Sequence, residues 1–162
     1  MGYHPSTSSI YVVFRGTNSL QNWITDLKFA KADYPYPRCS GCEVHKGFYQ
    51  AEQAVINDVL AEVKRLRGLY PSYQVVVTGH SLGAALAQLT AVDVKAAGYP
   101  VVSYHIGCPR VGDADFSKFV QNLLPDIHRI THDNDIVPQV PLQSMHFHHV
   151  AYEYFEDKNG AV

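Results

Sequence analysis

Ser81 stands between two glycines in the stretch VVVTGHSLGAALAQL, residues 75–89. An apolar, β-branched run precedes Gly79, and an alanine-rich run follows Gly83. A Gly-x-Ser-x-Gly segment between a buried strand and a helix is the pattern of a nucleophile elbow, a sharp turn that exposes the serine at the carboxyl end of a sheet. The helix N-terminus behind that turn favours developing negative charge. The sequence therefore predicts that Ser81 is a nucleophile, and the alternative is a chance match in a loop.

A serine hydroxyl is a poor nucleophile without a general base, and the base needs an acid that fixes its tautomer. In proteins with this elbow the chain order is serine, then aspartate or glutamate, then histidine. Asp133 and Asp135, in RITHDNDIVPQVP (129–141), both follow an apolar run. Composition alone does not choose between them, because either one can be a turn residue.

Strand-like and helix-like runs alternate along the chain. Strands are predicted at 10–16, 72–79, 101–107, 127–132 and 148–156, and helices at 47–67, 82–98 and 113–124. The predicted inward positions of the first and last helix are Ile56, Val59, Val63 and Leu66, and Phe116, Phe119, Val120 and Leu123. Segment 18–29 is a short amphipathic run, and 33–46 is a proline-rich loop. This alternation predicts one α/β domain over 1–162, with a mostly parallel sheet covered on both faces.

Composition excludes several classes of function. The chain has 162 residues, is 46% hydrophobic and carries a formal net charge of −2. Neither nucleic acid nor an anionic membrane is favoured as a partner, and no apolar run approaches the ~18 residues of a membrane span. No phosphate-binding glycine loop follows a strand, so we expect no nucleotide or other cofactor. The first nine residues, MGYHPSTSS, lack the apolar core of a secretory signal.

Three cysteines occur, two of them in the motif CSGC. Cys39 and Cys42 fit a redox pair, half of a zinc site, or a small loop closure. No second ligand pair stands at zinc spacing, and the flanking residues are rich in turn formers. We therefore expect no metal site and favour the loop closure, which suits an oxidising compartment. Cys108 follows an apolar run, and we expect a buried free thiol.

Several motifs resemble the fungal-type class 3 triacylglycerol lipases. They are VVFRGTNSLQNWITDL, VHKGF, YPSYQVVVTGHSLGAALAQL, PRVGDADF and RITHDNDIVPQVP, in this order over nearly all of 10–155. The resemblance implies an α/β-hydrolase-type fold, present here as an incomplete copy. It also implies a secreted enzyme that acts on lipid esters at an oil–water interface.

The resemblance assigns roles to individual residues. It selects Asp135 as the acid and Thr17 as the oxyanion-hole partner of the Leu82 backbone N–H. Segment 19–27, with Trp23, resembles the lid helix of these lipases. The CSGC motif is similar to a disulfide loop of some members, which pairs Cys39 with Cys42.

The chain also departs from the family pattern. It ends at Val162, before the position expected for the catalytic histidine, so we expect the base to lie outside these residues. His149 aligns with a structural histidine of the family and is a weaker candidate for the base. Ala84 stands where many of these lipases have a second glycine after Ser-Leu-Gly, and an alanine there resembles the related feruloyl-esterase branch. A phenolic-acid or polysaccharide ester is therefore an alternative substrate. A non-catalytic remnant that binds acyl chains or a partner is the alternative of another class.

Overall fold

The computed structural model describes residues 1–17, 29–37, 39–150 and 152–162. The strands are β1 (Gly2–His4), β2 (Ser9–Phe14), β3 (Lys31–Asp33), β4 (Glu43–His45), β5 (Gln74–His80), β6 (Val101–Ile106), β7 (Ile127–His132) and β8 (Glu153–Glu156). The helices are η1 (Pro5–Thr7), α2 (Lys46–Gln53), α3 (Ile56–Leu69), α4 (Leu82–Ala96), α5 (Ala114–Leu123), η2 (Val137–Gln139) and η3 (Gln143–Met145).

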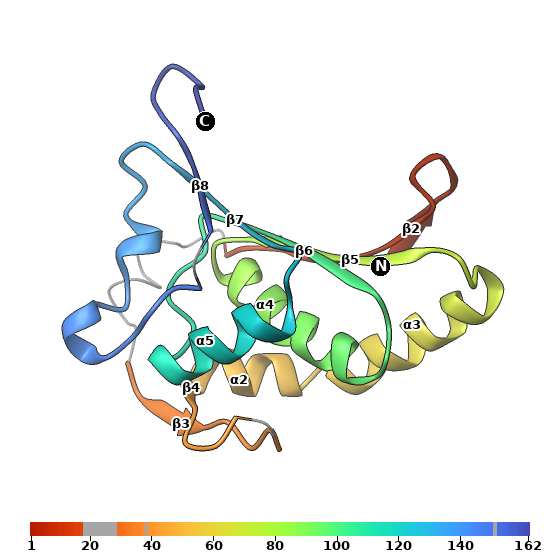
Figure 1. The fold of residues 1–162 in the computed structure, drawn as a ribbon, viewed down its shortest axis with the longest axis horizontal. Coiled ribbons are helices and arrows are strands. Elements are labelled where there is room, and N and C mark those ends of the chain that lie inside the picture. The colour runs from red at the N-terminus through yellow and green to blue at the C-terminus, as the bar shows by residue number, and fades with distance from the viewer. Residues whose placement is uncertain (18–28, 38, 151) are drawn as a thin grey trace.

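The main sheet has the strand order β1-β2-β5-β6-β7-β8. Each neighbouring pair is parallel except β1 and β2, which are antiparallel. The sheet confirms the predicted α/β architecture. Helices α2 to α5 lie on one side of it (Figure 1), so within the described ranges the expected cover on both faces is not observed. The opposite face exposes apolar and aromatic side chains, among them Val13, Tyr104, Ile106 and Tyr154.

Helix α4 lies against the central strands, and most of its residues are buried. A helix that is apolar on nearly all sides belongs in a protein interior. Its alanines have the best helix propensity and leave room for close packing against β5 and β6. This helix therefore holds its first turn, directly after Ser81, in a fixed position.

The predicted helix over 47–67 is two helices. The chain turns at Ala54 and Val55, where Val55 has a φ of −126° outside the helical range. Helix α2 packs against α4, whereas α3 packs against both β2 and α4. The turn lets the buried side of each helix face its own partner. The predicted inward positions of α3 are buried, and those of α5 are buried or packed on the core.

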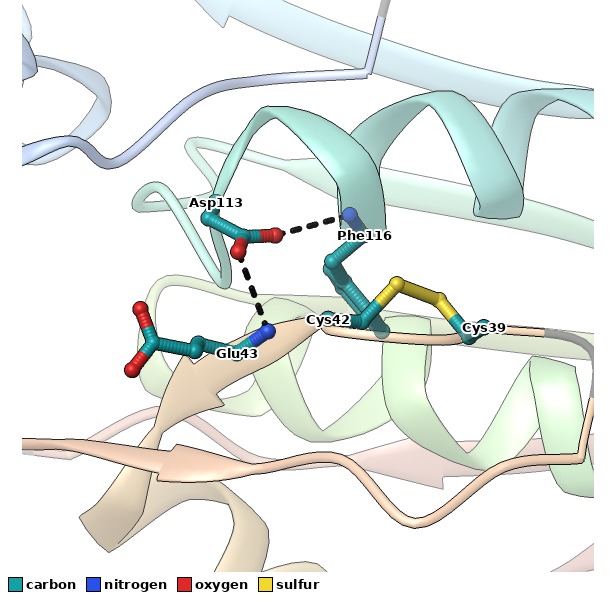
Figure 2. Close-up of a disulfide and its surroundings, with 5 residues drawn as sticks. All are labelled: Cys39, Cys42, Glu43, Asp113 and Phe116. Atoms are coloured by element: carbon teal, nitrogen blue, oxygen red, sulfur yellow. Dashed lines mark hydrogen bonds between the residues drawn. A yellow bond between two sulfur atoms is a disulfide. The ribbon is translucent and has the colours of Figure 1, made fainter.

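The predicted loop 33–46 is instead the connection and second strand of a short hairpin, because β3, which ends at Asp33, pairs with β4, with Ala32 opposite Val44. The Cys39–Cys42 disulfide lies in the connection between them, and Cys108 is free and buried, as predicted. Figure 2 shows how the hairpin is joined to α5: Asp113 caps that helix by accepting from Phe116 N at 2.8 Å, and it also accepts from Glu43 N at 3.1 Å.

The predicted strand over 148–156 is shorter than expected. Of its described residues, only Glu153–Glu156 pair in the sheet, alongside Arg129–His132 of β7. His148 instead forms an isolated antiparallel bridge with Gly112.

Candidate active site

Ser81 lies at the tight turn between β5 and α4, with a φ of 56°. Such a backbone costs a residue other than glycine about 1–3 kcal/mol, so the surrounding structure must hold it. A Cβ on Gly79 would overlap the carbonyl oxygen of Gly83, and a Cβ on Gly83 would overlap that of Phe14. The two glycines therefore allow β2, β5 and α4 to meet at backbone distance around Ser81.

The elbow pattern predicts an exposed serine, but Ser81 is only 1% exposed, because β2, β5 and α4 meet closely around the turn. Its hydroxyl makes no hydrogen bond with any described residue. The chain has nine histidines, and all of them fall within the described ranges. None of these rings therefore bonds the hydroxyl as a general base would.

The start of α4 and the end of β2 both lie beside Ser81. Leu82 is the first residue of α4, where backbone N–H groups have no partner within the helix. A Cβ on Gly16 would lie 3.5 Å from the Cβ of Ser81, so the chain that leads to Thr17 passes close to the hydroxyl. Thr17 lines an open hollow of about 460 Å³ together with Gly16 and His80. Thr17 therefore shares this hollow with His80, the residue before Ser81.

The two aspartates after β7 differ in their surroundings. Asp133 is exposed, has a φ of 34°, and accepts from the side chain of Asn134. Asp135 is half-buried, and its Oδ1 accepts from Val137 N at 2.9 Å. Its Oδ2 points toward Gly107, where an added Cβ would lie 2.7 Å from it.

Gly107 follows β6, the strand next to β5, and it links Asp135 to the elbow. The same added Cβ would lie 3.5 Å from Nε2 of His80. The φ of Gly107 is 53°, in the region that favours glycine. Asp135 and the residue before Ser81 therefore share one edge of the sheet. The sequence singled out neither Gly107 nor this contact of His80.

His149 lies beside the loop that follows Asp135, at Pro138. Its Nε2 hydrogen-bonds the carbonyl oxygen of Pro138 at 2.7 Å. Burial, reinforced by Arg129 and Arg110, lowers the pKa of His149 to about 4. The ring is therefore neutral at pH 7 and donates its Nε2 proton to that carbonyl. In the described structure, the hydrogen bond from His149 to Pro138 supports the loop that follows Asp135.

Arg110 also holds the Asp135 loop, and sequence reasoning gave it no individual role. Its guanidinium donates to the carbonyl oxygens of Gln139 and Pro141. Its only sequence signal was its place in PRVGDADF, directly after a predicted strand. Burial of an arginine depends on tertiary packing, which a single sequence does not reveal.

Some expectations receive no structural test. Trp23 and the rest of segment 19–27, which the resemblance assigns to the lid, lie outside the described residues. Among described side chains, no three histidine, cysteine or acidic groups gather as metal ligands would. No helix in the described ranges is both long and apolar enough to cross a membrane.

Comparison with known proteins gives consistent matches. The family model described as Lipase (class 3) matches residues 11–145. A secreted mono- and diacylglycerol lipase A from Penicillium cyclopium is 38% identical over 93% of this chain and 48% of its own length. A lipase from Rhizomucor miehei is 41% identical over 96% of this chain and 44% of its own length.

Solved structures agree with the sequence matches. The triacylglyceride lipase of Rhizomucor miehei superposes with a TM-score of 0.90 at 40% identity, over 96% of this chain and 60% of that one. A mono- and diacylglycerol lipase from Aspergillus oryzae gives 0.87 at 35% identity, over 93% and 55%. The chain spans about half the length of the curated relatives it matches.

Proposed function

This chain belongs to the class 3 lipase family, and on that premise we propose that it is the nucleophile-bearing part of a serine hydrolase for acylglycerol esters. The observation that carries the proposal is the strained elbow, which places Ser81 at the N-terminus of α4 and at the carboxyl edge of the parallel sheet. The names of the relatives, which are lipases of mono-, di- and triacylglycerols, favour this substrate class over a feruloyl ester.

In the proposed reaction, the Ser81 hydroxyl attacks the ester carbonyl and loses its proton to a general base. The tetrahedral intermediate collapses, the protonated alcohol leaves, and the acyl group stays on Ser81. Water then attacks this acyl-enzyme with the help of the same base and releases the carboxylic acid. The N–H of Leu82 and a donor from Thr17 stabilise the oxyanion, at about 3 kcal/mol for one such donor.

Asp135 is the acid that we propose for the triad. Its Oδ1 is occupied by the backbone of its own loop, while its Oδ2 faces the edge of the sheet that carries Ser81. A base placed between these two groups would receive its orientation from Asp135. Trp23 remains our proposal for the lid, and His149 serves better as a support of the loop than as the base.

We also propose that the protein works outside the cell on lipid surfaces. The Cys39–Cys42 disulfide supports an oxidising compartment, and relatives from Penicillium and Fusarium are named as secreted lipases. Cofactors have no role in the proposed reaction.

Covalent labelling of Ser81 tests the proposal. With imidazole added to act as the base, we expect an alkyl p-nitrophenyl phosphonate to add once per chain, on the peptide that contains Ser81, as measured by mass spectrometry. Ser81→Ala should remove the adduct, whereas Ser103→Ala, at a buried serine of β6, should leave it. A chain that never acquires an adduct at Ser81 would favour the non-catalytic alternative.

A further inference from the structure

A polar hollow of about 370 Å³ lies beside Pro138 and Gln139, in the loop that follows Asp135. The side chains that matter for its chemistry are Arg110, Arg129, Gln139, Gln143, His149 and Glu153. They come from five places in the chain: the segment after β6, the strand β7, the η2–η3 region, the segment between η3 and β8, and the start of β8. The hollow is therefore built by tertiary structure rather than by one exposed loop.

Two arginines in this hollow are buried, and each is only 7% exposed. Arg129 donates to Glu153 Oε1 at 2.8 Å, and Arg110 donates to two backbone carbonyls. The Nε–H of each arginine is buried and has no hydrogen-bond partner among the described residues. A guanidinium has five N–H donors and no acceptor, and burying it without acceptors is costly.

The charges of the hollow do not cancel. Glu153 is the one carboxylate among the described residues that line it, and this group already accepts from Arg129 and from Thr131 Oγ1 at 2.9 Å. His149 is neutral near pH 7, since its pKa is about 4. Arg110 meets only neutral carbonyl oxygens, so one positive charge has no carboxylate counterpart in the hollow.

We propose that this hollow binds a small oxyanion, a carboxylate or an inorganic oxyanion, between the guanidinium groups of Arg110 and Arg129. Arginine suits such a ligand because its planar set of donors matches two oxygen atoms. The amides of Gln139 and Gln143 line the same space and offer further N–H donors. The inference does not depend on the proposed lipase activity.

Binding would also act on the Asp135 loop. Arg110 holds the carbonyls of Gln139 and Pro141, and His149 holds that of Pro138. An anion that fixes Arg110 would therefore stabilise the segment that follows Asp135. For this reason we expect a saturable rise in melting temperature as well as direct binding.

Titration of the chain with sodium acetate and, separately, sodium phosphate tests the proposal. Sodium chloride keeps the ionic strength constant. The readouts are the NMR signals of the arginine Nε–H groups and the melting temperature. We expect saturable shifts of the Arg110 and Arg129 signals with at least one of the two anions. A response to acetate alone identifies a carboxylate site, a response to phosphate alone identifies an inorganic oxyanion site, and no saturable response to either overturns the proposal.

Two pairs of variants localise the binding. Arg110→Gln should weaken it about tenfold, as expected for a lost charged hydrogen bond, whereas Arg65→Gln removes an exposed charge elsewhere and should leave it unchanged. Glu153→Gln keeps an acceptor for Arg129 but removes the competing charge, so binding should tighten about fivefold. Glu62→Gln is the matched control on the exposed surface. The site would be refuted if Arg110→Gln bound the anion as tightly as Arg65→Gln, and Glu153→Gln as tightly as Glu62→Gln. If Arg110→Gln proved unstable, the comparison of Glu153→Gln with Glu62→Gln would decide alone.

Discussion

The glycines of the elbow show how single residues determine whether the site forms. A methyl group at Gly79 would overlap the backbone of Gly83, and the overlapping atoms belong to two rigid elements. We expect Gly79→Ala to destabilise the fold by about 2–3 kcal/mol, because neither β5 nor α4 can move without disturbing the core. The measurement is urea unfolding followed by circular dichroism.

Gly68 provides the control for that substitution. It lies in α3 with no atom within 4 Å of an added Cβ. Gly68→Ala should therefore stabilise the chain by about 0.5–1 kcal/mol through helix propensity alone. If both substitutions had the same small effect, the close approach of β5 and α4 would be wrong.

The cysteines give a second prediction at this scale. Burial raises the pKa of Cys108 to about 12, so its thiolate is scarce and inaccessible in the folded chain. A thiol reagent should react negligibly with the native protein and should count one thiol per chain after unfolding without reductant. Three thiols after unfolding would contradict the disulfide. Because Cys39 and Cys42 close so short a loop, Cys39→Ser with Cys42→Ser should cost well below about 2 kcal/mol.

The site residues differ in how far sequence alone could identify them. Ser81 was predictable because its neighbours impose a strand, a turn and a helix within a few positions. Asp135 and Asp133 are two positions apart and chemically identical, so only family resemblance favoured one, and only tertiary structure shows which faces Gly107. The role of Arg110 depends on carbonyls about 30 positions away in the chain, which no local pattern encodes.

At the scale of elements, the interface between α2 and α4 contains a buried acidic pair. Glu52 of α2 is fully buried, accepts from Gln53 and Thr90, and hydrogen-bonds Asp93 of α4. Desolvation, followed by the charge of Asp93, raises the pKa of Glu52 from 4.5 to about 8. Desolvation also raises the pKa of Asp93. Glu52 therefore holds a proton at neutral pH and shares it with Asp93.

This pair makes stability depend on pH. Between about pH 4.5 and 8 the unfolded chain releases the Glu52 proton while the folded chain keeps it, so stability falls as the pH rises. Glu52→Gln removes this dependence, because the amide cannot ionise. The free energy of unfolding of the variant, relative to that of the natural chain, should therefore rise by roughly 3 kcal/mol from pH 5 to pH 8, as measured by urea unfolding.

Glu62→Gln is the control for the pH experiment. Glu62 is exposed, and its hydrogen bond to Arg65 lowers its pKa, so it is ionised at both pH values. Its substitution should change stability equally at pH 5 and pH 8. A difference for Glu62→Gln as large as that for Glu52→Gln would mean that the effect does not arise between α2 and α4.

Long, strongly patterned elements were predictable, and short ones were not. The sequence predicted α4, β5, β6 and β7 because each has a continuous apolar run or a clear period and ends at a turn former. Strands β3 and β4 are three residues each and depend on pairing with one another. The break between α2 and α3 leaves the apolar period nearly intact, so only the separate packing partners of the two helices reveal it.

At the scale of the molecule, strand order explains why distant residues meet. Strands β2, β5, β6 and β7 are parallel neighbours, so their carboxyl ends lie along one edge. Thr17, Ser81, Gly107 and Asp135 each follow one of these strands, in the same order. Ligand sites of open α/β sheets lie at this edge for the same reason. The sequence predicted the strands but not their lateral order, because that order depends on pairing between strands far apart in the chain.

The hydroxyl of Ser81 has no basic partner among the nine histidines, and this determines what the isolated chain can do. Loss of the base from a serine triad costs on the order of 10⁶ in kcat, and the oxyanion donors leave roughly 10³-fold acceleration over water. We therefore expect chain 1–162 to hydrolyse p-nitrophenyl butyrate weakly, with little further loss in Ser81→Ala. Robust turnover that depends on Ser81 and is abolished by His149→Ala would instead identify His149 as the base.

Added imidazole should act as a base for Ser81, and the response tests how the residues at this edge of the sheet are arranged. An imidazole molecule between Ser81 and Asp135 can take the serine proton, so turnover above the Ser81→Ala background should rise about tenfold or more. Asp135→Asn should remove most of this rise, because Oδ2 orients the ring, whereas Asp133→Asn should keep it, because that exposed carboxylate bonds only with Asn134 beside it. Rescue that is equally strong in both variants would show that imidazole works without an orienting acid, and Asp135 would lose its proposed role. Loss in Asp133→Asn alone would transfer that role to Asp133.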